Sequence, residues 1–233
     1  MAQKMNLVLA AGLLCDAAVW QPVASLLADV ADVTIVDFIG LDSIEAMADA
    51  LLRQAPPRFA LAGHSMGARV AIEAWARGAD RIERLALLNT GIHNTRPGEA
   101  EKRAILVDLA RAEGIAAAGR AWLPPMMGKQ GVADNALMRD LAAMIDRSTP
   151  ETFARQINAL VTRPDAEGPL ATVNVPTLLL SATEDQWSPP AQHEAMLPHV
   201  PHGKLVVIQG AGHMAPVEQP EAVAAAMRTW LLS

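Results

Sequence analysis

Three polar residues, Ser65, Asp185 and His213, each stand in a loop that follows a short apolar run of the sequence. A serine hydroxyl is a weak nucleophile until a base removes its proton, and that base needs a third group to orient it. Ser65 is the centre of Gly63-His64-Ser65-Met66-Gly67, which lies between an apolar run and a segment of helical periodicity. In that context the Gly-x-Ser-x-Gly pattern predicts a strained turn that exposes Ser65 as a nucleophile.

The candidate base and its carboxylate come later in the chain. After the apolar run 177–181 the sequence contains Glu184-Asp185-Gln186-Trp187-Ser188-Pro189. After the run 204–208 it contains Gly210-Ala211-Gly212-His213-Met214. The residues themselves leave open whether Glu184 or Asp185 orients His213, because the two carboxylates are adjacent.

Apolar runs that alternate with helix-period segments predict the elements that position these side chains. Strands that alternate with helices form a parallel sheet with right-handed crossovers, and ligands bind beyond the carboxyl ends of such strands. The predicted fold class is therefore α/β, a mostly parallel sheet flanked by helices. We expect strands at 5–10, 33–36, 59–62, 85–89, 177–181 and 204–208, and a last helix at 220–232.

No strand-like run occurs between residues 98 and 163. Four helices are expected there, at 99–113, 115–123, 133–147 and 150–162, with Pro124-Pro125 and the segment 128–131 separating the middle pair. We interpret residues 93–169 as a helical insertion that acts as a lid, and residues 1–92 and 170–233 as the core. Most apolar side chains of the insertion are expected to pack between helices.

Composition excludes several classes of function. The 233 residues carry a net charge of −6 and no basic run, which argues against nucleic acid and stable membrane association as partners. One cysteine, Cys15, excludes an intramolecular disulfide framework. Residues 4–15 resemble a lipoprotein leader, but Leu14 stands where such a leader needs a small residue, so a central strand and a cytoplasmic protein are expected. Nothing in the sequence indicates an oligomeric state.

On these three motifs the chain resembles the α/β-hydrolase-fold serine hydrolases over nearly its whole length, and especially the small cofactor-free bacterial members with a helical cap. The resemblance implies that Ser65 is the nucleophile and His213 the general base and acid. It selects Asp185 as the orienting carboxylate, because the family's aspartate stands four residues before a proline and Pro189 fits that position. It implies no metal and no organic cofactor.

The resemblance also implies an oxyanion hole formed by the backbone N–H groups of Leu13 and Met66. Family members usually carry a histidine before the glycine of the first loop, whereas this chain has Ala11 before Gly12, so the usual brace of that loop is missing. Trp20, just past the loop, is expected to pack in the core. Candidates for the substrate pocket are Cys15, which either lines the pocket or packs behind it, His93, which either lines the pocket or lies on the surface, and Trp122, Met126 and Trp187.

Two other patterns are weaker. Residues 210–215 match a dinucleotide-binding pattern, but Pro216 and Pro220 interrupt the helix that should follow. His193, His199 and His202 invite a metal site, but they match no ligand motif and are expected on a solvated surface.

The expected reaction is hydrolysis of a small carboxylic ester with an apolar acyl group, through an acyl-enzyme. A serine at the elbow argues against the haloalkane dehalogenase and epoxide hydrolase schemes, which use an aspartate there. The sequence leaves thioesters, lactones, amides and C–C bonds open as alternatives on the same triad, and also a lyase or cofactor-free transferase. A non-catalytic ligand-binding protein on the same scaffold is the hypothesis from another class.

Overall fold

The computed structural model describes residues 4–233, and its centre is one six-stranded sheet in the order β2-β1-β3-β4-β5-β6. Every neighbouring pair of these strands is parallel. The α/β class predicted from the sequence is thereby confirmed. The strands are β1 (Met5–Ala10), β2 (Ala31–Val36), β3 (Phe59–His64), β4 (Ile82–Leu88), β5 (Thr177–Ala182) and β6 (Gly203–Ile208).

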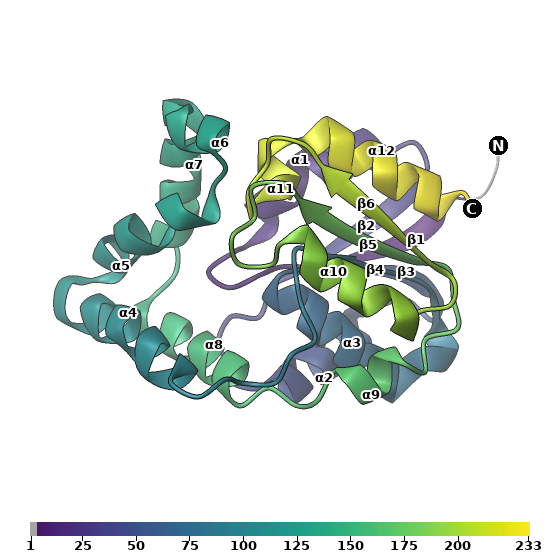
Figure 1. The fold of residues 1–233 in the computed structure, drawn as a ribbon, viewed down its shortest axis with the longest axis horizontal. Coiled ribbons are helices and arrows are strands. Elements are labelled where there is room, and N and C mark those ends of the chain that lie inside the picture. The colour runs from purple at the N-terminus through teal and green to yellow at the C-terminus, as the bar shows by residue number, and fades with distance from the viewer. Residues whose placement is uncertain (1–3) are drawn as a thin grey trace.

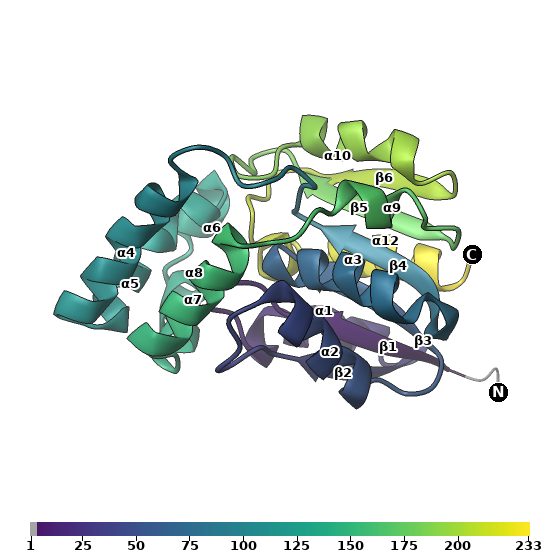
Figure 2. The ribbon, with the colours of Figure 1, turned by 90° about the horizontal axis from the view of Figure 1, so that it is seen from below.

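Helices cover both faces of the sheet (Figures 1 and 2). On one face lie α1 (Gln21–Leu27) and α12 (Pro220–Leu231), which pack on each other. On the other lie α2 (Ile44–Gln54), α3 (Met66–Gly78) and α10 (Pro190–Met196). This two-sided cover explains why β3 and β5 read as continuous apolar runs, since every one of their residues is buried.

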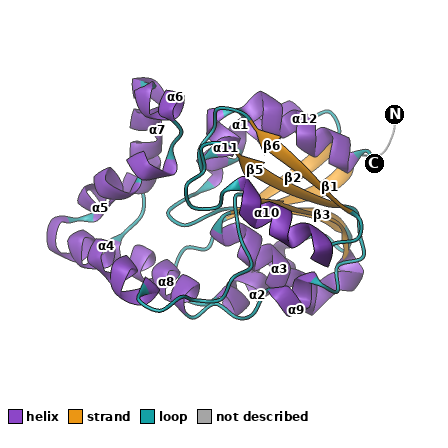
Figure 3. Ribbon diagram, in the orientation of Figure 1, coloured by secondary structure: helices purple, strands orange, loops and turns teal. Residues whose placement is uncertain are grey.

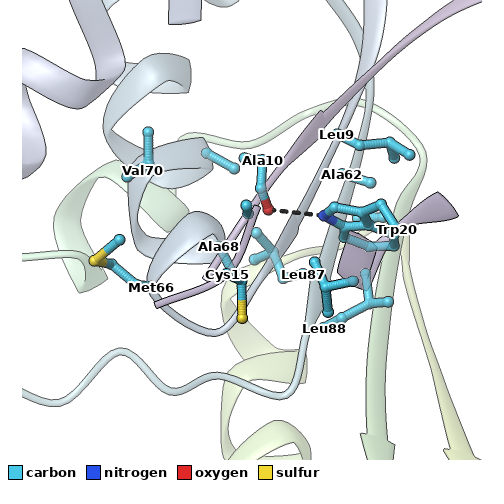
Figure 4. Packing of buried hydrophobic residues seen from close by; sticks show 14 of the residues in the cluster. Leu9, Ala10, Cys15, Trp20, Ala62, Met66, Ala68, Val70, Leu87 and Leu88 are labelled. Atoms are coloured by element: carbon cyan, nitrogen blue, oxygen red, sulfur yellow. Dashed lines mark hydrogen bonds between the residues drawn. The ribbon is translucent and has the colours of Figure 1, made fainter. Parts of the chain in front are cut away.

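The packing of the first loop against the sheet is visible in Figure 4. Trp20 is fully buried, and its indole N–H donates to the carbonyl of Ala10 at 3.1 Å. The expectation that Trp20 packs in the core is therefore confirmed. The bond matters because it holds the carboxyl end of β1, from which the first loop starts.

A group of helices between β4 and β5 lies beside the carboxyl edge of the sheet (Figure 3). These are α4 (Glu99–Glu113), α5 (Ile115–Trp122), α6 (Lys129–Ala133), α7 (Asn135–Asp146) and α8 (Pro150–Val161), followed by the short α9 (Glu167–Leu170), which contacts α3. The first five pack mainly on one another, α4 against α5 and α8, and α5 against α7. None of the helices that the structure describes is both long and apolar enough to cross a membrane.

One prediction about the helical insertion is wrong. The sequence predicted a break over residues 128–131, but Lys129–Ala133 forms α6. The N–H of Gly128 donates to Glu218 at 2.7 Å, and the N–H of Lys129 donates to Glu184 at 2.6 Å. Carboxylates at a helix N-terminus satisfy its free N–H groups and interact favourably with its dipole. Contacts from distant loops therefore stabilise a helix that the local sequence does not specify.

Candidate active site

Ser65 occupies a strained turn between β3 and α3. Its backbone has φ 56° and ψ −116°, a region that residues with a side chain rarely adopt. Gly63 and Gly67 make the turn possible, because a Cβ at Gly63 would collide with the backbone of Gly67 and one at Gly67 with the carbonyl of Ala10. The turn presents the hydroxyl of Ser65 at the carboxyl edge of the sheet, in front of the N-terminus of α3.

The three side chains singled out by the sequence form one continuous hydrogen-bonded chain. The Ser65 Oγ lies 2.8 Å from Nε2 of His213, and Nδ1 of His213 lies 3.0 and 3.1 Å from the two carboxylate oxygens of Asp185. An ionised carboxylate only accepts, so Nδ1 donates to it and Nε2 is left free to accept the proton of Ser65. The geometry is that of an activated serine nucleophile.

The structure separates the two adjacent carboxylates. Asp185 is buried and faces His213, whereas Glu184 accepts from the N–H of Lys129 in the helical insertion. Burial alone would raise the pKa of Asp185, but the charge of His213 and hydrogen bonds from His213, Asn89 and Ser188 hold it below its usual range. Asp185 is therefore ionised wherever His213 works as a base.

A cavity of about 460 Å³ opens onto Ser65 and His213. Its volume lies within the range of about 300–1,000 Å³ that is usual for small-molecule sites. Of the predicted pocket and oxyanion residues, Leu13, Met66, His93, Trp122, Met126 and Trp187 line it. His93 is exposed and lines the cavity at once, so the two alternatives for this residue are compatible.

The sequence and the fold place this chain among known proteins. A profile described as the alpha/beta hydrolase family matches residues 7–226. The chain belongs to the alpha/beta hydrolase family. Together with the solved structures described next, this match confirms the predicted family and the hydrolase class of enzyme.

Two bacterial proteins are similar to this chain in sequence. Pimeloyl-[acyl-carrier protein] methyl ester esterase of Neisseria meningitidis is 27% identical over 193 residues, which cover 81% of this chain and 75% of that protein. The biotin biosynthesis bifunctional protein BioHC of Cellvibrio japonicus is 25% identical over 236 residues, which cover 95% of this chain, but the match spans only 46% of that relative.

Two solved structures are similar throughout. A thermophilic esterase from Thermogutta terrifontis has a TM-score of 0.87 and 28% identity, covering 98% of this chain and 90% of its own. The enol-lactonase from Burkholderia xenovorans LB400 has a TM-score of 0.89 and 25% identity, covering 100% of this chain and 93% of its own.

The first loop lacks the histidine that usually supports it in this family, and a distant glutamine supports it instead. Leu14 has a positive φ of 58°, and its N–H donates to the side-chain oxygen of Gln156 on α8 at 2.9 Å. Gln156 is buried, and it reaches the loop from 142 residues away in the sequence. No local pattern in the sequence points to this residue, because only the fold brings α8 over the loop.

His64 supports the position of His213. The His64 ring is buried, and its Nε2 donates to the backbone carbonyl of His213 at 2.7 Å. Burial, followed by the charge of His213, lowers the pKa of His64 to about 4, so its ring is neutral at neutral pH. The sequence contained this residue within the elbow motif, but the spacing gave no sign of its contact with the distant loop.

The helical insertion also holds the loop of His213. The backbone N–H of His213 donates to the carbonyl of Met126 at 2.8 Å. Glu218 accepts from Gly212 at 2.9 Å with one oxygen and from Gly128 with the other. Burial raises the pKa of Glu218, against the effect of those backbone donors. One carboxylate thus joins the histidine loop to the start of α6.

Cys15 does not line the cavity, so its pocket assignment is replaced by the packing alternative. The side chain is buried in the hydrophobic cluster that Figure 4 shows in part, and its thiol donates to the carbonyl of Leu13 at 3.3 Å. Burial, followed by the charge of Asp16, raises the pKa of Cys15 to about 12. The thiol is therefore protonated and does not compete with Ser65 as a nucleophile.

The expectation of a solvated surface is wrong for His193. This side chain is fully buried, because α10 carries it against the loop after β4, where its Nε2 accepts from the N–H of Thr90 at 3.1 Å. Burial lowers the pKa of His193 to about 4. His202 is exposed, as expected, and His199 is half-buried. Within residues 4–233 no group of three or more His, Cys, Asp or Glu side chains is placed to hold a metal ion.

Proposed function

We propose that this hydrolase cleaves a small carboxylic ester through an acyl-enzyme, with Ser65 as nucleophile, His213 as general base and acid, and Asp185 as the orienting carboxylate. The observation that carries the proposal is the continuous hydrogen-bond chain from Ser65 through His213 to Asp185. The esterases among its relatives support an ester as the bond that is cleaved.

In the first half of the reaction, Ser65 Oγ attacks the carbonyl carbon while Nε2 of His213 takes its proton. The imidazolium then donates that proton to the departing alcohol, which leaves the acyl group on Ser65. In the second half, water gives a proton to His213 and attacks the acyl-enzyme, and His213 returns the proton to Ser65 as the acid is released. Asp185 stays ionised throughout and stabilises the imidazolium.

The oxyanion of each tetrahedral intermediate is assigned to the backbone N–H groups of Leu13 and Met66. Met66 is the first residue of α3, so its N–H has no acceptor one turn earlier in the helix. Gly12 lies close enough to Ser65 that a Cβ on Gly12 would be 3.3 Å from the serine Cβ, which brings the first loop to the nucleophile. Two such donors stabilise charge that develops in the transition state.

The acyl group or the alcohol group of the substrate is assigned to the apolar wall of the cavity. That wall comes from the helical insertion and consists of Leu106, Trp122, Met126, Ile157 and Leu160. Met126 lines the cavity, and its carbonyl accepts from the backbone N–H of His213. The position of the substrate and that of the catalytic histidine are therefore linked through one residue.

The test is turnover of p-nitrophenyl esters of increasing acyl length by the wild-type protein, by Ser65→Ala and by the control Ser25→Ala. Ser25 is an exposed serine on α1, outside the cavity wall. We expect turnover by wild type and Ser25→Ala, highest for short acyl groups, and none above background by Ser65→Ala. A fluorophosphonate probe should label Ser65 in the same two active proteins.

The outcomes separate the parts of the proposal. Equal turnover by Ser65→Ala overturns the assignment of the nucleophile. Labelling of Ser65 without turnover of any ester overturns the ester substrate and keeps the nucleophile. Neither labelling nor turnover overturns both and favours a non-catalytic ligand-binding protein.

A further inference from the structure

The wall of the active-site cavity is positively charged, although the chain as a whole carries a net charge of −6. Among the described residues Glu99 is the only carboxylate in that wall, against five cationic side chains. The five are Arg69, Arg96, Lys102, Arg103 and Arg163. The positive charge is thus a local feature of the cavity.

Glu99 is fully engaged by two of these cations. Its two oxygens accept from both terminal nitrogens of Arg163 at 2.8 Å, and one of them also accepts from Arg103 at 3.0 Å. Burial alone would raise the pKa of Glu99, but the hydrogen bonds from Arg163 and the Arg96 backbone and the charges of Arg163 and Arg103 lower it to about 2. The oxygens of Glu99 are therefore occupied by Arg163, Arg103 and the Arg96 backbone rather than by Arg69.

Arg69 is a buried guanidinium that makes no hydrogen bond to a carboxylate of the described residues. It is 6% exposed, and its Nη2 donates to the carbonyl of His93 at 2.6 Å. Its Nη1 is buried and has no hydrogen-bond partner among the described residues. Burial, followed by the charge of Arg163, lowers the pKa of Arg69 to about 9, which still leaves it charged at neutral pH. The charges of Glu99 and Asp165 act on Arg69 from a distance, but no carboxylate is in direct contact with it. A buried charge without a directly bonded counter-ion is costly, so a site that retains one is suited to an anionic ligand.

Arg69 is also close to the nucleophile along the helix. It lies four residues after Ser65, which caps α3, and so belongs to the first turn or so of that helix. Both line the one cavity. A molecule with a carbonyl at Ser65 and an anionic group a few bonds away spans the two positions.

We propose, on the basis of the ester hydrolysis proposed above, that the substrate carries a free carboxylate and that Arg69 binds it. The substrate class is then a monoester of a short dicarboxylic acid. The guanidinium of Arg69 donates to the carboxylate, and the exposed Arg96 and Lys102 at the cavity wall attract the anion. Charge-assisted hydrogen bonds to a carboxylate are stronger than neutral ones, so Arg69 determines specificity rather than chemistry.

The experiment compares two nearly isosteric substrates, monomethyl glutarate and methyl glutaramate, which differ in a carboxylate and an amide. The value of kcat/KM is measured for the wild type, for Arg69→Met and for Arg120→Met. Arg120 is an exposed arginine on α5 outside the cavity wall and serves as the matched control. We expect wild type and Arg120→Met to prefer the acid by about tenfold to a hundredfold, and Arg69→Met to lose that preference. No preference in the wild type, or an unchanged preference in Arg69→Met, overturns the proposal.

A second measurement keeps the proposal testable if Arg69→Met does not fold. Glutarate and glutaramide are compared in the wild type as competitive inhibitors of p-nitrophenyl acetate hydrolysis and as protectants of Ser65 against a fluorophosphonate. Stronger inhibition and protection by glutarate support the anion site. Ester turnover with equal effects of the two compounds overturns the anion site alone. If no ester is turned over but glutarate still protects Ser65, ester hydrolysis alone is overturned. If no ester is turned over and glutarate gives no protection, both ester hydrolysis and the anion site are overturned.

Discussion

The sheet and the helical insertion contribute to the same site by different physical means. Ser65, Asp185 and His213 follow β3, β5 and β6, which are held by the backbone ladder of a sheet buried on both faces. A ladder fixes each strand end relative to its neighbours through main-chain bonds that do not depend on side-chain identity. The residues proposed to react therefore lie at or just beyond strand ends whose relative positions the ladder sets.

The insertion, in contrast, contacts the core through individual hydrogen bonds, some from its backbone and some from its side chains. Arg155 donates to the carbonyl of Gly40, Asn158 donates to the carbonyl of Asp42, and Gln156 accepts from Leu14. Its helices otherwise pack mainly on one another. This difference indicates that substitutions at the strand ends abolish the reaction, whereas substitutions in the insertion change substrate choice and rate by smaller factors.

The largest effect is expected for Ser65→Ala. Loss of the nucleophile removes covalent catalysis, so kcat/KM for a short p-nitrophenyl ester should fall on the order of 10⁵ to 10⁶-fold. The thermal midpoint should not fall, because the residue sits in a strained turn and the substitution removes only a hydroxyl. A fall in kcat/KM of less than about tenfold would contradict the claim that residues at the strand ends carry out the reaction.

The second-largest effect on catalysis is expected for Asp185→Asn. Asp185→Asn removes the charge that holds the tautomer of His213, and kcat should fall about 10³ to 10⁴-fold. Glu184→Gln is the matched control, since Glu184 contacts Lys129 and not His213. Steady-state kinetics of the two variants give the comparison. A larger loss of kcat in Glu184→Gln than in Asp185→Asn would mean that Glu184, not Asp185, orients His213.

A smaller effect on catalysis is expected for substitution of Gln156, which holds the first loop from the insertion. Gln156→Met has a similar size but leaves the N–H of Leu14 without its acceptor, which costs about 1–3 kcal/mol. If the lost hydrogen bond displaces the first loop, which carries the proposed oxyanion donor Leu13, kcat should drop about tenfold. Gln156→Glu, which keeps an acceptor, should recover part of the loss. Equal kcat for all three proteins would show that the loop is held by the sheet alone.

The smallest effect is expected on the pH dependence of thermal stability, in the variant Glu99→Gln. Its pKa is lowered in the folded state to about 2 from 4.5, so its pairing with Arg163 and Arg103 stabilises the fold fully above about pH 4.5. That contribution is lost as the pH falls toward about 2. Thermal unfolding at pH 7 and pH 3 should therefore show a smaller acid-induced decrease of Tm, by a few degrees, in Glu99→Gln than in wild type. The same decrease in both proteins would rule out this linkage.

The sequence predicted the strands and the long helices well because each is specified by its own periodicity. The predicted strand at 5–10 coincides with β1, and the predicted helix at 99–113 coincides with α4. The predictions were wrong where the stabilising contacts are distant. The α6 helix depends on Glu184 and Glu218, and the burial of His193 depends on the packing of α10 against the loop after β4.

By itself the sequence determined the α/β class, the elbow around Ser65 and the three loops in which reactive side chains stand, because local patterns encode each of these. The tertiary structure showed that Asp185, which the family resemblance had selected over Glu184, faces His213. Only the tertiary structure decided that Gln156 holds the first loop, and that Arg69 is buried beside the cavity without a hydrogen bond to a carboxylate of the described residues. The reason is that these relations join segments up to 142 residues apart, and no short-range pattern records a contact made across the fold.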